Sequence, residues 1–167
     1  MIVHVRMDER LIHGQVATAW IRYYDANAVI IPSDEVANSE IDKMALKLAA
    51  SMIQGLKLSI VGLQRGIELL HDPRCESMRI MIVCRTPQDV LEIAKHVEGI
   101  PGINLANYGD QKKSDVEIVK SLGSSNTLRL SKEDLECVKQ IVATGIPCWI
   151  QKAREDREIT LSSSDFE

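Results

Sequence analysis

The 167-residue sequence predicts an α/β fold: an open, mostly parallel central sheet of about six or seven strands with helices on both faces. Short apolar runs alternate along the chain with stretches of helical period. Runs such as residues 29–31 and 80–83 are apolar on both alternating faces, which is typical of strands that helices cover on both sides. The chain holds only two Trp, three Tyr and one Phe, so aliphatic side chains must build the core, which favours α/β layers over an aromatic-rich β-sandwich.

Taken in order, the apolar runs predict seven strands, at residues 2–6, 28–32, 58–61, 79–84, 102–106, 127–130 and 147–151. A further edge strand at residues 159–161 is compatible with the pattern. The mixed-charge run before it, residues 154–158, predicts a solvated surface.

The segments between the strands predict helices. The first begins near Gly14 or Gln15 and carries Val16, Ala17, Trp20, Ile21 and Tyr24 on one side. A stripe over residues 41–52 predicts a second helix whose apolar side chains, methionines included, fill the core; its members are Ile41, Met44, Ala45, Leu48, Ala49 and Met52. Further on, Thr86-Pro87 starts a helix that Gly99 stops, and Ser131 with Asp134 resembles a capping box on a helix closed by Gly145. Residues 114–122 predict a short helix.

The bulk composition limits the class of function. The length fits one domain over residues 1–167. A net charge of −4 argues against nucleic-acid partners, which need a basic face. The N-terminus lacks the pattern of a signal peptide and no apolar run approaches a membrane span, so we expect a cytoplasmic protein. The four cysteines have no metal-type spacing, which predicts reduced, buried thiols and no metal site.

The chemistry concentrates in the loop between the first strand and the first helix. Residues 7–14 hold two carboxylates, Arg10, His13 and Gly14, and Arg6 closes the strand. Ligands gather at the carboxyl ends of strands in open α/β sheets, and a helix N-terminus favours an anion. Gly14 lets the backbone approach such a group closely. We therefore expect an anionic group at His13.

A neutral imidazole is a good nucleophile near neutral pH. Arg10 and Arg6 are placed to neutralise phosphoryl oxygens, and Asp8 or Glu9 to orient an arginine or the ring. The set suits phosphoryl transfer better than acyl transfer. On local chemistry alone, surface salt bridges around an ordinary loop histidine are an equally good interpretation.

Residues 6–16, Arg-Met-Asp-Glu-Arg-Leu-Ile-His-Gly-Gln-Val, resemble the active-site signature of enzyme IIB components of the bacterial sugar phosphotransferase system, mannose/fructose/sorbose family. Residues 33–37 resemble a second family segment, which adds Ser33 and Asp34 as secondary site candidates. Length and β–α order agree along most of the chain. The family often has Gly-Gly after the fifth strand, whereas residues 104–109 here read Asn-Leu-Ala-Asn-Tyr-Gly and the next loop looks longer.

The resemblance implies that His13 accepts phosphate from a phosphohistidine of enzyme IIA and passes it to a sugar bound in the membrane IIC/IID complex. The sugar class is mannose, fructose, sorbose or N-acetylgalactosamine. Arg10 is the expected phosphoryl ligand, with Arg6, Asp8, Gly14 and Gln15 in support. The resemblance implies no metal and no cofactor, and peripheral association with the permease; a homo-oligomer is also compatible with it.

Two other classes of function stay open at this point. A nucleotide-binding enzyme is disfavoured because no G-x-G-x-x-G or Walker-type loop follows the first strand. A non-catalytic regulatory or adaptor domain of the same fold is disfavoured because His13 is present together with Arg6 and Arg10. The other histidines, His4, His71 and His96, are expected to be packed or surface residues.

Overall fold

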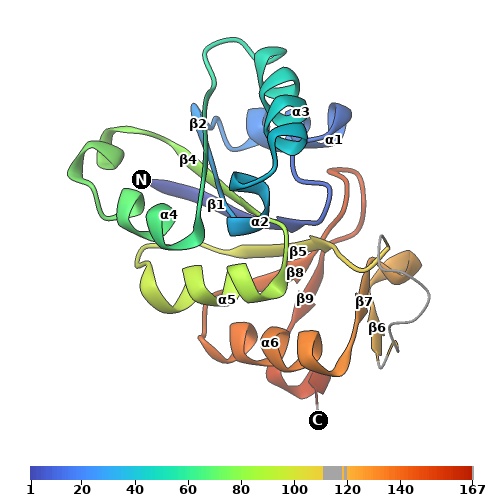
Figure 1. Cartoon of the computed structure of the whole chain (residues 1–167). Coiled ribbons are helices and arrows are strands. Elements are labelled where there is room, and N and C mark those ends of the chain that lie inside the picture. The colour runs from blue at the N-terminus through green and yellow to red at the C-terminus, as the bar shows by residue number, and fades with distance from the viewer. Residues whose placement is uncertain (111–117, 119, 167) are drawn as a thin grey trace.

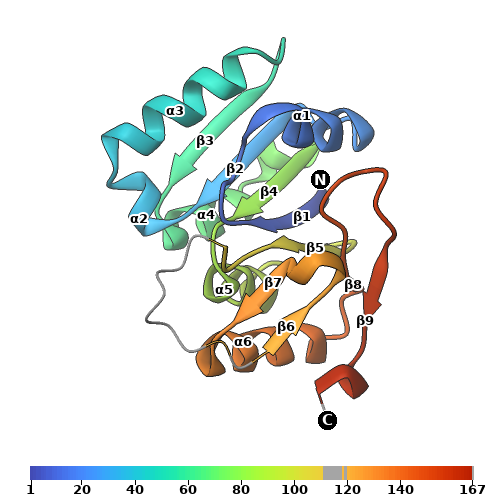
Figure 2. The same ribbon diagram turned by 90° about the vertical axis from the view of Figure 1, so that its right-hand side faces the viewer.

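The computed structural model describes residues 1–110, 118 and 120–166, apart from the side chains of residues 15, 16 and 125. Its centre is an open sheet that confirms the predicted fold class (Figures 1 and 2). Within the described residues the sheet has seven strands, in the order β3 (Lys57–Val61), β2 (Ala28–Pro32), β4 (Ile80–Cys84), β1 (Ile2–Asp8), β5 (Ile103–Asn107), β8 (Cys148–Ile150) and β9 (Ile159–Leu161). All pairings are parallel except that of β8 with β9.

One predicted strand lies elsewhere. Residues 127–130 were expected in the central sheet, but β7 (Leu128–Leu130) pairs antiparallel with β6 (Lys120–Leu122) in a separate two-stranded sheet. The edge strand β9 takes the seventh place in the central sheet. The short helix predicted over residues 114–122 falls largely outside the described residues, and its last three residues are β6 rather than helix.

Helices cover both faces of the sheet (Figure 2). The buried side chains of α1 (Gly14–Tyr23), α2 (Asp34–Ala37) and α3 (Glu40–Ser51) belong to one core cluster, against the face of Val29, Ile31, Met81 and Val83. Those of α4 (Leu63–Leu70), α5 (Pro87–His96) and α6 (Lys132–Ala143) belong to the cluster on the other face. Short 3₁₀ turns are Pro73–Ser77, Ser124–Asn126 and Ser163–Phe166.

The helix starts follow their capping residues. Thr86 caps α5 by accepting from the Asp89 N–H, and Pro87 follows at the first helical position. Ser131 and Asp134 form the predicted capping box of α6. These local signals explain why the β–α order could be predicted from the residues.

The prediction for α3 is wrong in one respect. The stripe was expected in the core, yet the exposed fractions are 81% for Ile41, 70% for Met44, 70% for Leu48 and 81% for Met52. The helix has a second apolar side, on which Leu46 and Ala50 are buried, and it is this narrower side that faces the sheet. Four large apolar side chains are therefore left in solvent.

The remaining histidines follow the expectation, and the cysteines follow it in part, because only two of the four are buried. His4 is buried and stacks on Tyr24 with ring centroids 4.1 Å apart; burial and repulsion by Arg6 lower its pKa to about 3, so it is neutral. His71 caps the end of α4, and His96 pairs with Glu92 on the surface of α5. The four cysteines are free; Cys84 and Cys148 are buried, the other two half-buried.

The strand order creates a switch point. β1 lies between β4 and β5, and the chain leaves β1 toward β2 on one side but leaves β5 toward β8 on the other. The two connections diverge above the carboxyl ends of β1 and β5, where open α/β sheets bind their ligands. His13 follows β1 at this edge.

Candidate functional site

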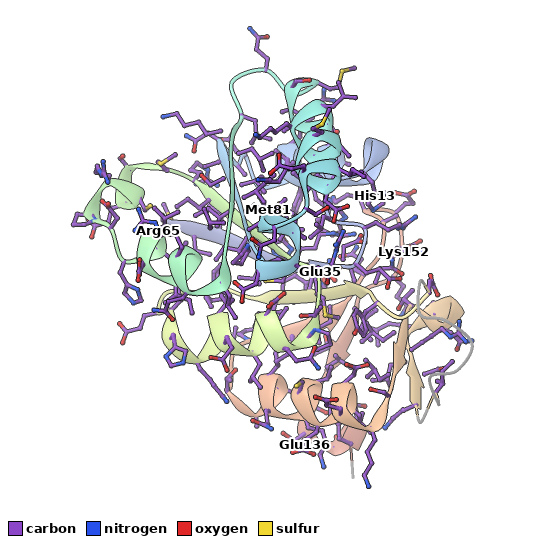
Figure 3. All side chains as sticks on the ribbon, in the orientation of Figure 1. His13, Glu35, Arg65, Met81, Glu136 and Lys152 are labelled. Atoms are coloured by element: carbon purple, nitrogen blue, oxygen red, sulfur yellow. The ribbon has the colours of Figure 1, made fainter. Side chains whose placement is uncertain are left out.

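The loop after β1 is a tight turn that brings His13 back over the strand end. The Leu11 N–H donates to the Asp8 carbonyl at 2.9 Å, and the Arg10 N–H donates to Asp8 Oδ1 at 3.1 Å. Leu11 has a φ of 59° although it is a bulky residue, and its buried side chain anchors the turn. Figure 3 shows His13 at the edge of the molecule where Lys152 also lies.

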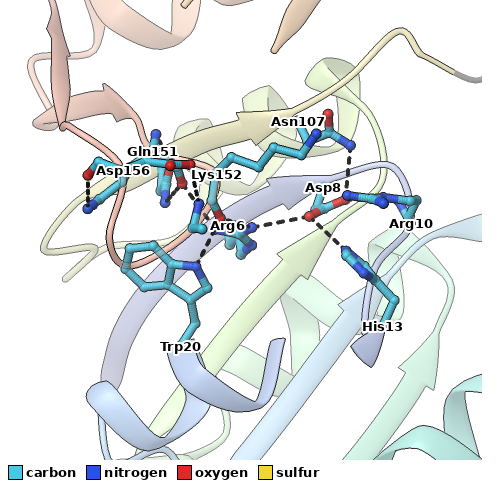
Figure 4. Close-up of polar contacts among 11 residues, drawn as sticks. Arg6, Asp8, Arg10, His13, Trp20, Asn107, Gln151, Lys152 and Asp156 are labelled. Atoms are coloured by element: carbon cyan, nitrogen blue, oxygen red, sulfur yellow. Dashed lines mark hydrogen bonds and ion pairs between the residues drawn. The ribbon is translucent and has the colours of Figure 1, made fainter. Parts of the chain in front are cut away.

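Asp8 is the centre of the site (Figure 4). Its carboxylate is 1% exposed; Oδ2 accepts from Arg6 Nη2 at 3.2 Å and contacts His13 Nε2 at 3.2 Å. Asn107 Nδ2, from the end of the neighbouring strand β5, donates to Oδ1 at 3.4 Å. Burial alone would raise the Asp8 pKa, but the His13 hydrogen bond and the Arg6 charge outweigh it and hold that pKa below its usual value. Asp8 is therefore a carboxylate.

The contact with Asp8 determines which nitrogen of His13 is available. A carboxylate only accepts hydrogen bonds, so Nε2 carries the proton and Nδ1 carries the lone pair. Within the described residues, no hydrogen bond to Nδ1 is present. The side chain is 25% exposed, so a group outside the protein can reach the ring.

His13 also stands at the N-cap of α1, and its side chain makes no capping hydrogen bond. The first turn of this helix therefore has backbone N–H groups without helical acceptors, and it contains no acidic residue. The positive end of the helix dipole lies beside the ring. An anionic group on His13 would meet a favourable field there.

The two arginines occupy different environments. Arg6 is 2% exposed, and besides Asp8 it donates to the Gln151 carbonyl at 3.4 Å and the Lys152 carbonyl at 2.9 Å. Its guanidinium also lies 5.2 Å from the ring centre of Trp20. Arg10 is 39% exposed, with Nε 3.9 Å from Asp8 Oδ1. Arg10 is thus the arginine that can turn toward a group on His13, and Arg6 holds Asp8.

The other candidates lie as follows. Gly14 is exposed with a φ of +51°, a conformation that favours glycine, and a Cβ there would meet open space. The side chain of Gln15 lies outside the described part of the structure. Ser33 is buried and caps α2, and Asp34 Oδ1 accepts from the Leu63 N–H at 2.9 Å. Within the described residues neither is hydrogen-bonded to Asp8, Arg10 or His13.

Sequence reasoning missed three partners of the loop. Asn107 had a partial signal, because it directly follows the strand expected at residues 102–106, although the sequence did not place that strand beside the first one. Gln151 and Lys152 had none, because they bind Arg6 through backbone carbonyls that any residue supplies. Glu9, named as an alternative to Asp8, is buried and accepts from the Gly109 N–H at 3.1 Å.

In the part of the chain that the structure describes, no group of three or more His, Cys, Asp or Glu side chains is arranged to hold a metal ion. Over the same residues, none of the helices is both long and apolar enough to cross a membrane.

Fold and site together define an open α/β protein with a histidine–carboxylate pair at the carboxyl edge of its parallel strands. Comparison with known proteins then identifies the family. The chain belongs to the sorbose subfamily of IIB components of the phosphotransferase system (PTS), whose family model matches residues 2–164.

Two relatives and one solved structure illustrate the match. A probable phosphotransferase enzyme IIB component of Streptococcus pyogenes serotype M6 is 35% identical, covering 86% of this chain and 85% of the relative. An N-acetylgalactosamine-specific phosphotransferase enzyme IIB component 2 of Escherichia coli is 30% identical, and the match covers 90% of this chain and 89% of that relative. The crystal structure of the IIB domain of the sorbose permease of Klebsiella pneumoniae, at 24% identity, superposes with a TM-score of 0.82 over 95% of this chain and 92% of that one.

Proposed function

We propose that this chain is a phosphoryl carrier in which Nδ1 of His13 accepts phosphate from a phosphohistidine of enzyme IIA. The phosphate then passes to a sugar bound by the membrane IIC/IID complex. The observation that carries the proposal is the contact of Nε2 with Asp8, which leaves Nδ1 as the nucleophile of a side chain that is 25% exposed. Membership of a family of PTS IIB components supports the same transferase role.

In the accepting step, the lone pair of His13 Nδ1 forms the new N–P bond while the N–P bond of the donor histidine breaks. The bonding electrons stay on the donor nitrogen as its lone pair, so a donor ring that is protonated at its other nitrogen leaves as neutral imidazole. The His13 ring becomes positively charged when Nδ1 is phosphorylated, because Nε2 keeps its proton. The Asp8 carboxylate stabilises that charge at 3.2 Å from Nε2.

The phosphoryl oxygens are held by positive groups of the loop. Arg10 is exposed enough to fold over them, and the free N–H groups at the start of α1 face the same space. Such transfer needs positioning and charge stabilisation rather than further covalent chemistry. Gln15 is a supporting ligand in this proposal, and Ser33 and Asp34 are secondary supporting candidates.

The names of the relatives indicate the class of sugar that is transported. They are specific for N-acetylgalactosamine and sorbose, so we place the sugar in the mannose, fructose, sorbose or N-acetylgalactosamine class. The carrier acts as a single domain in the cytoplasm and is peripherally associated with the membrane permease complex.

Intact-protein mass spectrometry tests the proposal. The chain is incubated with phosphoenolpyruvate, the general phosphotransferase proteins and a mannose-family enzyme IIA. We expect one acid-labile, alkali-stable phosphoryl group, absent in His13→Ala and retained in the matched control His96→Ala on the exposed surface of α5. Arg10→Ala should slow the gain by about 10²–10³-fold, the usual cost of removing one stabilising charge. Phosphorylation of His13→Ala, or no gain by the wild type with several donors, would refute the carrier role.

A further inference from the structure

The side chain of Asn107 reaches the site from the neighbouring strand β5 (Figure 4). It is completely buried, and its Nδ2 donates to Asp8 Oδ1 at 3.4 Å. Its backbone carbonyl accepts from the Glu9 N–H at 3.1 Å. The side chain and the backbone of this residue therefore contact two successive residues at the start of the active-site loop.

An irregularity in the sheet turns the Asn107 side chain toward Asp8. Met7 of β1 pairs with Leu105 of β5. The next residue, Asp8, pairs with Asn107, so Ala106 is an extra residue in β5 and forms a β-bulge. With regular pairing, Asn107 would share the face of Leu105, which belongs to the larger core cluster. The bulge thus brings a polar side chain to the carboxylate, as bulges beside functional sites commonly do.

The orientation of the Asn107 amide suits Asp8 rather than the amide itself. A carboxylate only accepts hydrogen bonds, so the NH₂ end of the amide must face it. The Oδ1 end is buried, and within the described residues it has no hydrogen-bond donor. A buried acceptor without a donor is destabilising and uncommon in proteins. Its presence here indicates that the amide serves the site.

The two oxygens of the Asp8 carboxylate have different partners. Oδ2 contacts Arg6 Nη2 and His13 Nε2, each at 3.2 Å. Oδ1 accepts from the Arg10 N–H at 3.1 Å and from Asn107. Arg10 belongs to the same turn as Asp8 and moves with it, whereas Asn107 belongs to the sheet. The donor from the sheet therefore fixes how the carboxylate is rotated and keeps Oδ2 toward the histidine ring.

We propose that Asn107 is a positioning residue for phosphoryl transfer: it holds the Asp8 carboxylate in the rotation that keeps the ring proton of His13 on Nε2. This inference rests on the proposed carrier function, because it explains how the accepting nitrogen Nδ1 keeps its lone pair. Asn107 is completely buried, so it touches neither the donor protein nor the phosphoryl group. Its effect passes through Asp8.

The tautomer of His13 is measured without any phosphodonor, by nitrogen NMR of the histidine rings at about pH 8.5, where histidine is ordinarily neutral. A ring nitrogen with a proton and one with a lone pair have well-separated signals, and those of His13 are assigned by their loss in His13→Ala. The wild type should have the proton on Nε2. In Asn107→Ala the two signals should move toward each other, because a fraction of the rings then has the proton on Nδ1. His4, His71 and His96 are internal references and should not change.

Single-turnover phosphorylation separates positioning from docking. Phosphoryl gain by His13 is measured against the concentration of enzyme IIA, at a temperature where the variant is folded. In Asn107→Ala the maximal rate should fall about 10-fold, as expected for the loss of a hydrogen bond to a charged group. The half-saturating concentration of enzyme IIA should stay at the wild-type value. The rate with phosphoramidate, a small donor that needs no protein surface, should fall by the same factor.

Thr127→Val is the matched control for the loss of a buried polar group. Thr127 is buried, and its hydroxyl donates to the Leu122 carbonyl at 3.4 Å, away from Asp8. This variant should change neither the tautomer of His13 nor the transfer rate.

A measurement on the wild type keeps the inference testable if Asn107→Ala does not fold. The NMR signal of the Asn107 NH₂ group should shift when His13 is phosphorylated with phosphoramidate, because the ring then becomes positively charged and attracts the Asp8 carboxylate. The NH₂ group of Asn104 on the same strand donates to the Gln151 carbonyl at 2.8 Å, and its signal should shift less.

Three outcomes would overturn the inference: a wild-type tautomer and maximal rate in Asn107→Ala, a change in the half-saturating concentration of enzyme IIA alone, or an Asn107 NH₂ signal that ignores phosphorylation. A loss of stability with an unchanged tautomer would show a purely structural role and would overturn it as well. Failure of the wild type to accept phosphate from any donor would instead refute the carrier function, and it would leave the tautomer measurement unaffected.

Discussion

Replacing Asp8 by asparagine is the sharpest test of how the site is built, because it removes one charge and almost no volume. The Asp8 carboxylate meets four donors, from Arg6, His13, the Arg10 backbone and Asn107. An asparagine has one acceptor oxygen and one donor NH₂ in their place. Whichever way the amide turns, its NH₂ group faces two donors that lose their acceptor.

The cost to stability follows from burial. Removing one partner of a buried ion pair usually costs about 3–5 kcal/mol. Arg6 keeps its bonds to the carbonyls of Gln151 and Lys152, so we expect the lower end of that range, about 3 kcal/mol. For a domain of this size, that corresponds to a fall in Tm of roughly 6–12 °C.

The effect on transfer should be larger than the loss of stability implies. When the asparagine NH₂ donates to His13 Nε2, the ring proton moves to Nδ1, and the nucleophilic lone pair is lost. The corresponding change in a Ser-His-Asp triad lowers the rate by about 10⁴ through the wrong tautomer, so a loss of about 10³–10⁴-fold is expected here.

Single-turnover phosphorylation, followed by intact mass at a temperature where the variant is folded, measures the rate, and urea denaturation measures the stability. Asp25→Asn is the matched control: Asp25 is 92% exposed, and its φ of 50° suits asparagine. A wild-type transfer rate in Asp8→Asn would refute the assignment of Nδ1. An unchanged urea midpoint would refute the coupling of Asp8 to Arg6.

Two further predictions concern stability. Burial raises the pKa of Asp89 to about 6, so the folded chain binds this proton more tightly than the unfolded chain and loses stability as pH rises from about 4 to 6. The free energy of unfolding of Asp89→Asn should therefore exceed that of the wild type by about 1–2 kcal/mol at pH 7, a figure reduced because the side chain is partly exposed. At pH 3.5 the two proteins should be equally stable. Equal urea midpoints for both proteins at pH 7 would contradict this. Gly14→Ala should lower the free energy of unfolding by about 1 kcal/mol in the same assay. The φ of +51° at this position is strained for any residue with a side chain, although an added Cβ would contact no other atom. A Gly14→Ala protein as stable as the wild type would show that the loop relaxes to another conformation.

The β–α order could be predicted because the information is local. Apolar runs such as β4 and caps such as Thr86 and Ser131 specify their elements within a few residues. The place of an element in the sheet is not local information. Residues 128–130 have the pattern of a core strand, yet they pair with residues 120–122, and no short-range signal distinguishes the two arrangements.

The orientation of α3 shows a second limit. Hydrophobic period reveals that a helix has an apolar side, but α3 has two, and Leu46 with Ala50 rather than Met44 with Leu48 faces the sheet. An apolar stripe that stays in solvent looks the same in a sequence as one that is buried in the core.

In the site itself, His13 and Asp8 could be brought together because one short turn contains both. The motif alone could not predict that Arg6 is buried against Asp8 while Arg10 is exposed, because a motif treats the two arginines as equivalent. The alternation of side chains along a strand does distinguish them. Val5 and Met7 point into the larger core cluster. His4, Arg6 and Asp8 alternate with them and therefore share the opposite face of β1. Arg6 is therefore committed to the interior, whereas Arg10 lies in the turn.

The hydrogen bonds of Arg6 have a consequence for how the site forms while the chain is synthesised. The carbonyl groups that hold its guanidinium belong to residues 145 and 146 positions further along the chain, so they are synthesised long after Arg6 itself. A growing chain that has released only its first half has both His13 and Asp8, but Arg6 still lacks the acceptors that keep it beneath Asp8. His13 and Asp8 are thus synthesised well before the segment whose carbonyls hold Arg6. A chain cut before Gln151 should therefore lack the carbonyl acceptors that keep Arg6 beside the Asp8 carboxylate.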